Sequence, residues 1–135
     1  MKIVVAGAGK VGEVICRDLC FEDHEITLIE LNEKRLESMI SSYDITGVLG
    51  SGSLAVVQRE ADVPECDIFI AVTPDDETNL IAAITAKSIG ADYVIARVRS
   101  PEYSKQMTFL RESLGISVMI NPELEAAREV MRGMR

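Results

Sequence analysis

Six residues near the amino end, Gly7-Ala8-Gly9-Lys10-Val11-Gly12, have the spacing G-x-G-x-x-G. They follow a short apolar run and open a helical pattern, which is the context that a dinucleotide-binding loop requires. Gly7 permits a tight turn, Gly9 lets the backbone approach a pyrophosphate, and Gly12 lets the helix pack closely on the strand. The free N–H groups at the helix start would bind the phosphates. The segment therefore predicts a nucleotide site, with a glycine turn that binds no ligand as the alternative.

A carboxylate follows at the spacing expected for the ribose of such a nucleotide. Glu30 comes 23 positions after Gly7, at the end of the second apolar run, where an acid accepts hydrogen bonds from ribose hydroxyls. Each bond of this kind contributes roughly 1.5–3 kcal/mol. The carboxylate would repel a ribose 2′-phosphate by about 4 kcal/mol, for unit charges about 4 Å apart at an effective dielectric of about 20. NAD(H) is therefore favoured over NADP(H). ATP or ADP, with the same free ribose hydroxyls, and a solvated acid without a ligand are the alternatives.

Residues at the ends of the other apolar runs should line the same crevice. Gly50-Ser51-Gly52-Ser53 leaves room for an adenine, and Thr73-Pro74 faces the glycine loop. Arg97 could bind a phosphate through its charge and fork geometry, or could pair with an acid, which is the favoured interpretation of Arg99. Lys10 could reach a phosphate or remain solvated. The residues predicted to bind the cofactor are Gly7, Ala8, Gly9, Lys10, Val11, Gly12, Glu30, Ser51, Thr73, Pro74 and Arg97.

The elements that must position these residues alternate regularly along the chain. Short runs rich in valine and isoleucine are apolar on both faces, which is typical of strands in a parallel sheet covered on both sides. Helices are predicted between them, with caps that include Asn32, Thr73 and Ser100. Because crossovers between parallel strands are right-handed, the order predicts an α/β fold in one domain: a Rossmann-type doubly wound sheet of six strands in the order 3-2-1-4-5-6. The predicted strands are 2–6, 26–31, 45–49, 68–72, 93–98 and 117–120.

Composition argues against several classes of partner. The net charge is −8, with 22 acidic and 14 basic residues, which disfavours nucleic acid and an anionic membrane surface. No apolar run approaches the roughly 20 residues that cross a bilayer, and no signal peptide is visible. We therefore expect a cytoplasmic protein without direct membrane insertion. The three cysteines are an odd and sparse set, which does not suit a disulfide framework. We expect them to be buried apolar residues.

The chain lacks the usual groups of catalysis. His24 is the only histidine and lies in a polar turn, and no nucleophile elbow is present. Asp75, Asp76 and Glu77 could hold a cation, but acids at a helix start are explained by the helix dipole, so no metal site is predicted. A dehydrogenase requires a substrate domain and usually a general acid or base. We therefore predict that the chain is not an enzyme. The alternatives are the cofactor domain of an NAD-dependent oxidoreductase without its catalytic half, and an adaptor for AMP-like ligands.

Several of these segments together resemble a known family. Gly7–Gly12, Glu30, Gly50–Ser53, 71–79 and 95–103 are similar to the N-terminal RCK or KTN domain of Trk-type potassium-uptake regulators, from Met1 to about Met131. The resemblance implies a regulatory domain that binds NAD(H) or ATP/ADP and is no enzyme. It also implies dimers or rings on the cytosolic face of a membrane-embedded potassium-translocating subunit, whose gating the nucleotide adjusts.

The same resemblance implies roles for single residues. Nucleotide contacts would come from Gly7 through Val11, Glu30, Thr73-Pro74 and Arg97, and in some members a basic residue at the place of Lys10 reaches a terminal phosphate. Many members have an acid where Ser51 stands, so this polar contact differs. Such regulators continue into a C-terminal domain, and residues 1–135 are expected to form the N-terminal domain alone.

The last predicted helix is a candidate dimer surface. It begins at Asn121-Pro122, and little of the chain remains to cover its apolar face. Folding back onto its own sheet is the alternative. The face carries Leu124, Ala127, Met131 and Met134.

Overall fold

The computed structural model describes residues 1–119 and residue 132. Six parallel strands form one sheet of order β3-β2-β1-β4-β5-β6, which confirms the predicted fold. The face predicted as a dimer surface lies outside the described residues. The strands are β1 (Lys2–Ala6), β2 (Glu25–Glu30), β3 (Thr46–Leu49), β4 (Ile68–Ala71), β5 (Tyr93–Arg97) and β6 (Ser117–Met119).

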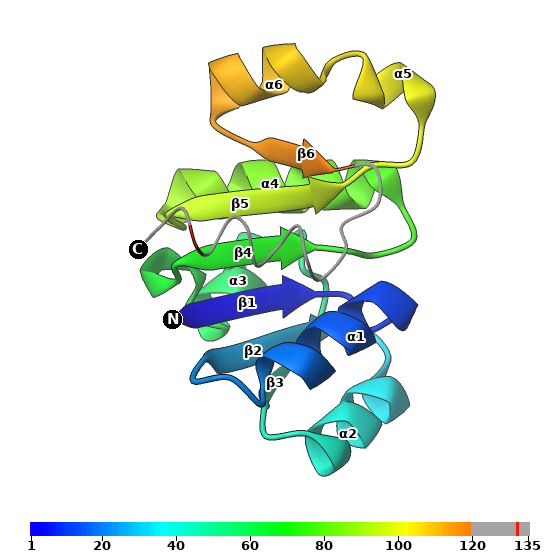
Figure 1. Ribbon diagram of the computed structural model, residues 1–135, viewed down its shortest axis with the longest axis vertical. Helices are drawn as coiled ribbons and strands as arrows, with labels where there is room; N and C mark the ends of the chain where they lie inside the picture. Colours follow the sequence, from blue (N-terminus) through cyan, green and yellow to red (C-terminus); the bar gives the residue numbers. More distant parts are fainter. Residues whose placement is uncertain (120–131, 133–135) are drawn as a thin grey trace.

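Helices cover both faces of the sheet (Figure 1). Strand residues alternate between the two faces, so Ile3 and Val5 pack under α1 and α2 while Val4 packs under α3 and α4. Within the described residues, no helix is long and apolar enough to span a bilayer. The helices are α1 (Lys10–Leu19), α2 (Glu33–Ser42), α3 (Ala55–Glu60), the short 3-10 helix η1 (Val63–Glu65), α4 (Asp76–Ile89), α5 (Pro101–Ser104) and α6 (Met107–Leu114).

The register of the central strands brings their carboxyl ends to one level. Ala6 at the end of β1 pairs with Ile29 on one side and with Ala71 on the other. After β1 the chain turns into α1 on one face, and after β4 it turns into α4 on the opposite face (Figure 1). Ligands of open α/β sheets bind where the chain parts in this way. The fold therefore places the glycine loop and Thr73 on two sides of one crevice.

Some predicted details of the helices are wrong. Asp75, and not Thr73, caps α4, because the Asp75 carboxylate accepts the Thr78 N–H at 2.9 Å. The helix predicted to start at Ser100-Pro101 is divided into α5 and α6, and the Ser100 side chain makes no capping bond. The Asn32 cap is confirmed, since its side chain accepts the Arg35 N–H at 3.0 Å.

The predicted burial of the cysteines holds for two of the three. Cys16 and Cys66 are buried, whereas Cys20, in the last turn before β2, is half-exposed. Burial raises the pKa of the Cys16 thiol to about 12, with smaller contributions from Cys20 and Glu13. It also raises the pKa of Cys66 to about 12. These two thiols therefore behave as apolar core groups at neutral pH.

Candidate functional site

A crevice of about 280 Å³ opens at the carboxyl ends of β1 to β4. This volume is close to the lower limit for small-molecule sites, about 300 Å³. Its lining comes from the glycine loop, the end of β2, the loop after β3 and the loop after β4, together with one residue each from α2 and α4. The predicted site residues that the structure brings together here are Gly7, Ala8, Gly9, Glu30, Ser51, Thr73 and Pro74.

The fold itself requires glycine at two positions of the loop. Gly7 has a φ of +112°, in the region that disfavours side chains, and its N–H donates to the Ile29 carbonyl at 2.9 Å. A Cβ on Gly12 would lie 1.9 Å from the Gly7 carbonyl oxygen. Gly12 therefore allows the first turn of α1 to lie directly on the loop, as predicted from the motif.

Gly9 differs from both, because no contact within the described part of the chain requires a glycine there. Its φ of −71° suits any residue, and a Cβ added to it would meet no atom of residues 1–119 within 4 Å. Gly9 lies at the N-cap of α1, next to the free N–H groups of the first turn, and lines the crevice. The open space in front of Gly9 is where a phosphate bound at this helix start would lie.

Glu30 is buried in the wall of the crevice and makes two backbone hydrogen bonds that the sequence did not predict. Its side chain is 8% exposed. Oε1 accepts the Ala8 N–H at 2.8 Å, and Oε2 accepts the Asn32 N–H at 2.7 Å. A carboxylate has about four acceptor positions, so two remain for other donors. Glu30 therefore fixes the glycine loop to the end of β2 and still has the capacity to bind a pair of ribose hydroxyls.

The opposite wall is organised by Asn79, which the sequence analysis did not identify. Asn79 is fully buried in α4. Its Oδ1 accepts from the Thr73 N–H at 2.9 Å and from the Thr73 hydroxyl at 2.7 Å. Its Nδ2 donates to the carbonyls of Thr73 and Arg97, both at 2.9 Å. The amide thus uses all its hydrogen-bonding groups to hold the ends of β4 and β5 together. The sequence feature that could have identified Asn79 is an amide side chain within an alanine- and isoleucine-rich helix.

The acids at the start of α4 have structural partners. The Thr78 hydroxyl and N–H donate to Asp75 and lower the pKa of its carboxyl group. Asp76 accepts the N–H groups of Arg99 and Ser100 at 3.0 and 2.7 Å. Within the described part of the chain, no group of His, Cys, Asp or Glu has the arrangement of a metal site.

Contacts of the same kind tie the crevice wall to the segment after β5. The Arg99 guanidinium donates to the Pro74 carbonyl at 2.8 Å, so among the described residues the guanidinium bonds to the backbone, and the acid side chain of Asp76 bonds to Arg99 only through the backbone N–H. The Tyr103 hydroxyl donates to Glu77 at 2.9 Å, which raises the pKa of Tyr103. Together with Asp76 and Asn79, these bonds join the loop after β4 to the start of α5.

Four predicted site residues lie off the lining of the crevice. Lys10 is exposed at the start of α1, Val11 packs against the core under that helix, and Gly12 supports the loop from below. Arg97, half-buried at the end of β5, has a buried Nε without a hydrogen-bond partner among the described residues. Arg35 from α2 does line the crevice, although the sequence analysis did not select it.

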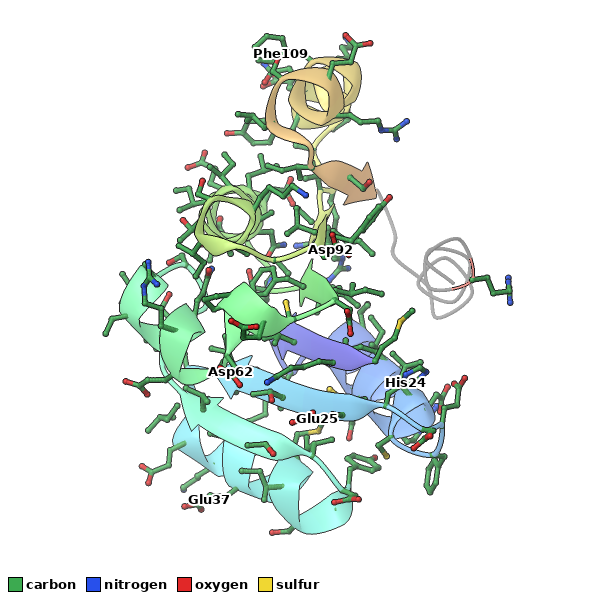
Figure 2. All side chains as sticks on the ribbon, turned by 90° about the vertical axis from the view of Figure 1, so that its left-hand side faces the viewer. His24, Glu25, Glu37, Asp62, Asp92 and Phe109 are labelled. Carbon is green, nitrogen blue, oxygen red and sulfur yellow. The ribbon has the colours of Figure 1, made fainter. Side chains whose placement is uncertain are left out.

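The edge of the sheet opposite the crevice carries the histidine. Figure 2 looks onto the edge where the strands begin, and His24 and Glu25 lie there. His24 Nδ1 is 3.3 Å from the amino group of Met1. At about 3.3 Å per residue, β2 separates His24 from Glu30 by roughly 20 Å. The imidazole therefore cannot act on a ligand in the crevice.

The parallel sheet, the glycine loop at its switch point and the acid that ends β2 define a Rossmann-type domain. Residues 3–122 match the TrkA-N domain, and the chain belongs to this family. The Trk system potassium uptake protein TrkA homolog of Archaeoglobus fulgidus is 39% identical over 132 residues. That match covers 98% of this chain and 30% of the relative, so the chain spans less than a third of its length.

Solved structures agree with this fold. The TrkA-N domain of the inner membrane protein ybaL from Escherichia coli has a TM-score of 0.76 at 19% identity, covering 99% of this chain and 96% of that one. Structures of GsuK bound to NAD and to ADP have TM-scores of 0.73 and 0.71 at 21% identity. They match 88% and 87% of this chain, and 21% and 30% of theirs. The chain is thus a relative of Trk potassium-uptake proteins and has the fold of the GsuK RCK domain.

Proposed function

We propose that the crevice binds NAD(H), with ATP or ADP as the alternative, and that the chain senses the nucleotide without chemically changing it. The observation that carries this proposal is Gly9, a glycine that its own fold does not need. A glycine kept free of neighbours at a helix start suits a ligand whose phosphate must approach the backbone. The residues proposed to contact the nucleotide are Gly7, Ala8, Gly9, Lys10, Val11, Gly12, Glu30, Ser51, Thr73, Pro74 and Arg97.

Glu30 supports a ligand that carries free ribose hydroxyls. Its two unused acceptor positions suit the 2′- and 3′-hydroxyls, which NADH and ATP share. The glycine loop is already held by the Glu30 bond to Ala8 and by the bond from Gly7 to Ile29. A loop fixed before binding loses little conformational freedom when the ligand arrives. The crevice therefore has the properties of a preformed nucleotide site.

The titratable groups of the crevice support sensing over catalysis. Glu30 is held by two backbone N–H groups, and Asp75, whose pKa is lowered, stays ionised at neutral pH. Arg35 is the third charged residue of the lining. Among the described residues, the lining contains no His, Cys, Lys or Tyr side chain that could act as a general acid or base. These residues do not support the alternative function, a cofactor domain of an NAD-dependent oxidoreductase.

The family relationship supports a role in potassium transport. We propose that residues 1–135 act as the N-terminal nucleotide-binding domain of a Trk-type regulator, on the cytosolic face of a membrane-embedded potassium-translocating subunit. The domain would assemble into homodimers or larger rings. Bound nucleotide would bias one arrangement of the assembly over another, by no more than its differential affinity for the two.

Calorimetric titration of the full chain with NADH, NAD, ATP and ADP tests the binding proposal. Glu30→Gln is the informative variant, because it removes the charge but keeps one acceptor for a backbone N–H. We expect about tenfold or greater loss of affinity for every ligand with free ribose hydroxyls. Glu37→Gln on the exposed face of α2 makes the same charge change outside the crevice lining and serves as the control. The proposal would be refuted if the parent chain bound none of the four ligands.

A further inference from the structure

The crevice continues into a second hollow beside the ribose position. Ala8 and Arg35 line both spaces, and the second hollow is bordered by Glu13 from α1 and by Asn32 and Lys34 near the start of α2. Arg35 and Lys34 are exposed. No ion pair of either side chain occurs among the described residues. Two cationic side chains therefore border the space next to the carboxylate of Glu30.

The position of Arg35 relative to Glu30 follows from the backbone. The Glu30 Oε2 accepts the Asn32 N–H, and the Asn32 side chain in turn accepts the Arg35 N–H. These two bonds hold the start of α2 against the acid, so the Arg35 side chain extends from a fixed point at the rim. In Rossmann-type sites an arginine near the ribose position accommodates a 2′-phosphate.

The charges beside the ribose position differ from those expected of Glu30 alone. Its carboxylate is bonded to two backbone N–H groups, and its charge and that of Glu13 are opposed by Arg35 and Lys34. A guanidinium binds a phosphate through two parallel hydrogen bonds, and this attraction can offset the repulsion from a carboxylate at a similar distance. Arg35 and Lys34 therefore counteract the repulsion of a 2′-phosphate by Glu30.

We propose that Arg35, assisted by Lys34, forms a subsite for a phosphate ester on the adenosine ribose, so that the crevice accepts NADPH as well as NADH. This inference rests on the proposed nucleotide site and names its specificity. The second hollow provides the space for the phosphate. Arg35 is then the residue that determines how strongly the domain distinguishes the two cofactors.

Titration of the full chain and its variants with NADH and NADPH tests the subsite. We expect the parent to bind NADPH within about tenfold of NADH. Arg35→Ala should weaken NADPH binding about ten- to hundredfold, the range for hydrogen bonds between charged partners, and change NADH binding by about twofold or less. Arg35→Lys should retain part of the NADPH affinity, because it keeps the charge but loses the fork.

Arg111→Ala provides the matched control. It removes the same exposed side chain from α6, and Figure 2 places α6, marked by Phe109, at the opposite end of the molecule from Glu37 on α2. This variant should bind both cofactors as the parent does. The NADPH affinity of the parent should also fall more steeply with added salt than its NADH affinity, since salt screens the extra charge at this exposed site.

Other outcomes would overturn the inference. An equal loss of both cofactors in Arg35→Ala would assign the guanidinium to the adenine or pyrophosphate, which the two ligands share. A parent chain that binds NADH but not NADPH would show that Glu30 excludes the phosphate despite Arg35. Binding of neither cofactor by the parent would refute the nucleotide site itself, so the two failures are distinguishable.

Discussion

Two glycines of one loop should respond in opposite ways to the same substitution. A Cβ added to Gly9 meets no atom of the described residues within 4 Å, whereas one added to Gly12 lies 1.9 Å from the Gly7 carbonyl oxygen. We therefore predict that Gly9→Ala weakens nucleotide binding about tenfold or more but leaves the fold stable. Gly12→Ala should destabilise the fold itself. The pair separates a glycine that serves the ligand from one that serves the packing of α1.

The expected changes in stability follow from these contacts. At Gly9 the lower entropy of the unfolded chain stabilises the alanine variant by about 0.4–1 kcal/mol. Alanine is a poorer N-cap than glycine, which offsets this gain, so the free energy of unfolding should change by about 0.5 kcal/mol or less. Forcing a methyl group against the backbone at Gly12 should cost roughly 1–3 kcal/mol or more. That corresponds to a fall in Tm of at least about 4 °C.

Calorimetry and thermal unfolding with NADH then measure the effect on binding. In the parent, NADH at about 100 times its Kd adds about 2.7 kcal/mol of stability, or roughly 10 °C in Tm. The methyl group on Gly9 would occupy the phosphate position, and losing one hydrogen bond to a charged group weakens binding about tenfold or more. Gly9→Ala should therefore lose about half of the thermal shift or more at the same NADH concentration. Binding of NADH within about threefold of the parent would refute our placement of the phosphate. So would a loss of stability as large as that of Gly12→Ala.

Two further predictions concern thiols and acid. An alkylating reagent at pH 8 should modify Cys20 in the native protein and reach Cys16 and Cys66 only after unfolding, because burial raises the pKa of both thiols to about 12. Mass spectrometry of the alkylated protein measures this, and rapid modification of all three cysteines would contradict it. The lowered pKa of Asp75 stabilises the fold above the ordinary carboxyl pKa, and the contribution disappears as pH falls through the folded value. The difference in the free energy of unfolding between the parent and Asp75→Asn should therefore shrink below about pH 4. A constant difference from pH 3 to 7 would show that the charge of Asp75 does not contribute to stability.

The sequence predicted those features that depend on local patterns. Apolar runs of fixed length and the crossover rule were sufficient for the strand order, and the glycine spacing together with Glu30 located the crevice. The cap of α4 was assigned wrongly because Thr73 and Asp75 are both good caps. Only the structure shows that the Thr73 hydroxyl is already bonded to Asn79.

Features that depend on packing between distant segments could not be predicted. Asn79 bonds to Arg97, 18 positions away, and Asp76 to Ser100, 24 positions away. Arg35 reaches the crevice because of the direction in which α2 leaves β2. That direction depends on the bond between Glu30 and Asn32 and on the packing of Leu36. No periodicity in the sequence contains this information.

Glu30 links the stability of the loop to its capacity for a ligand. An acid used only for a ligand would have free oxygens in its absence, and burying them would be unfavourable. Glu30 instead accepts one N–H on each oxygen, which compensates its burial and fixes Ala8 in place. The same bonds orient its remaining acceptor positions. The arrangement therefore exists before a nucleotide binds, and little binding energy is needed to order it. In the proposed sensor, the energy not used for ordering would remain available to shift the proposed assembly.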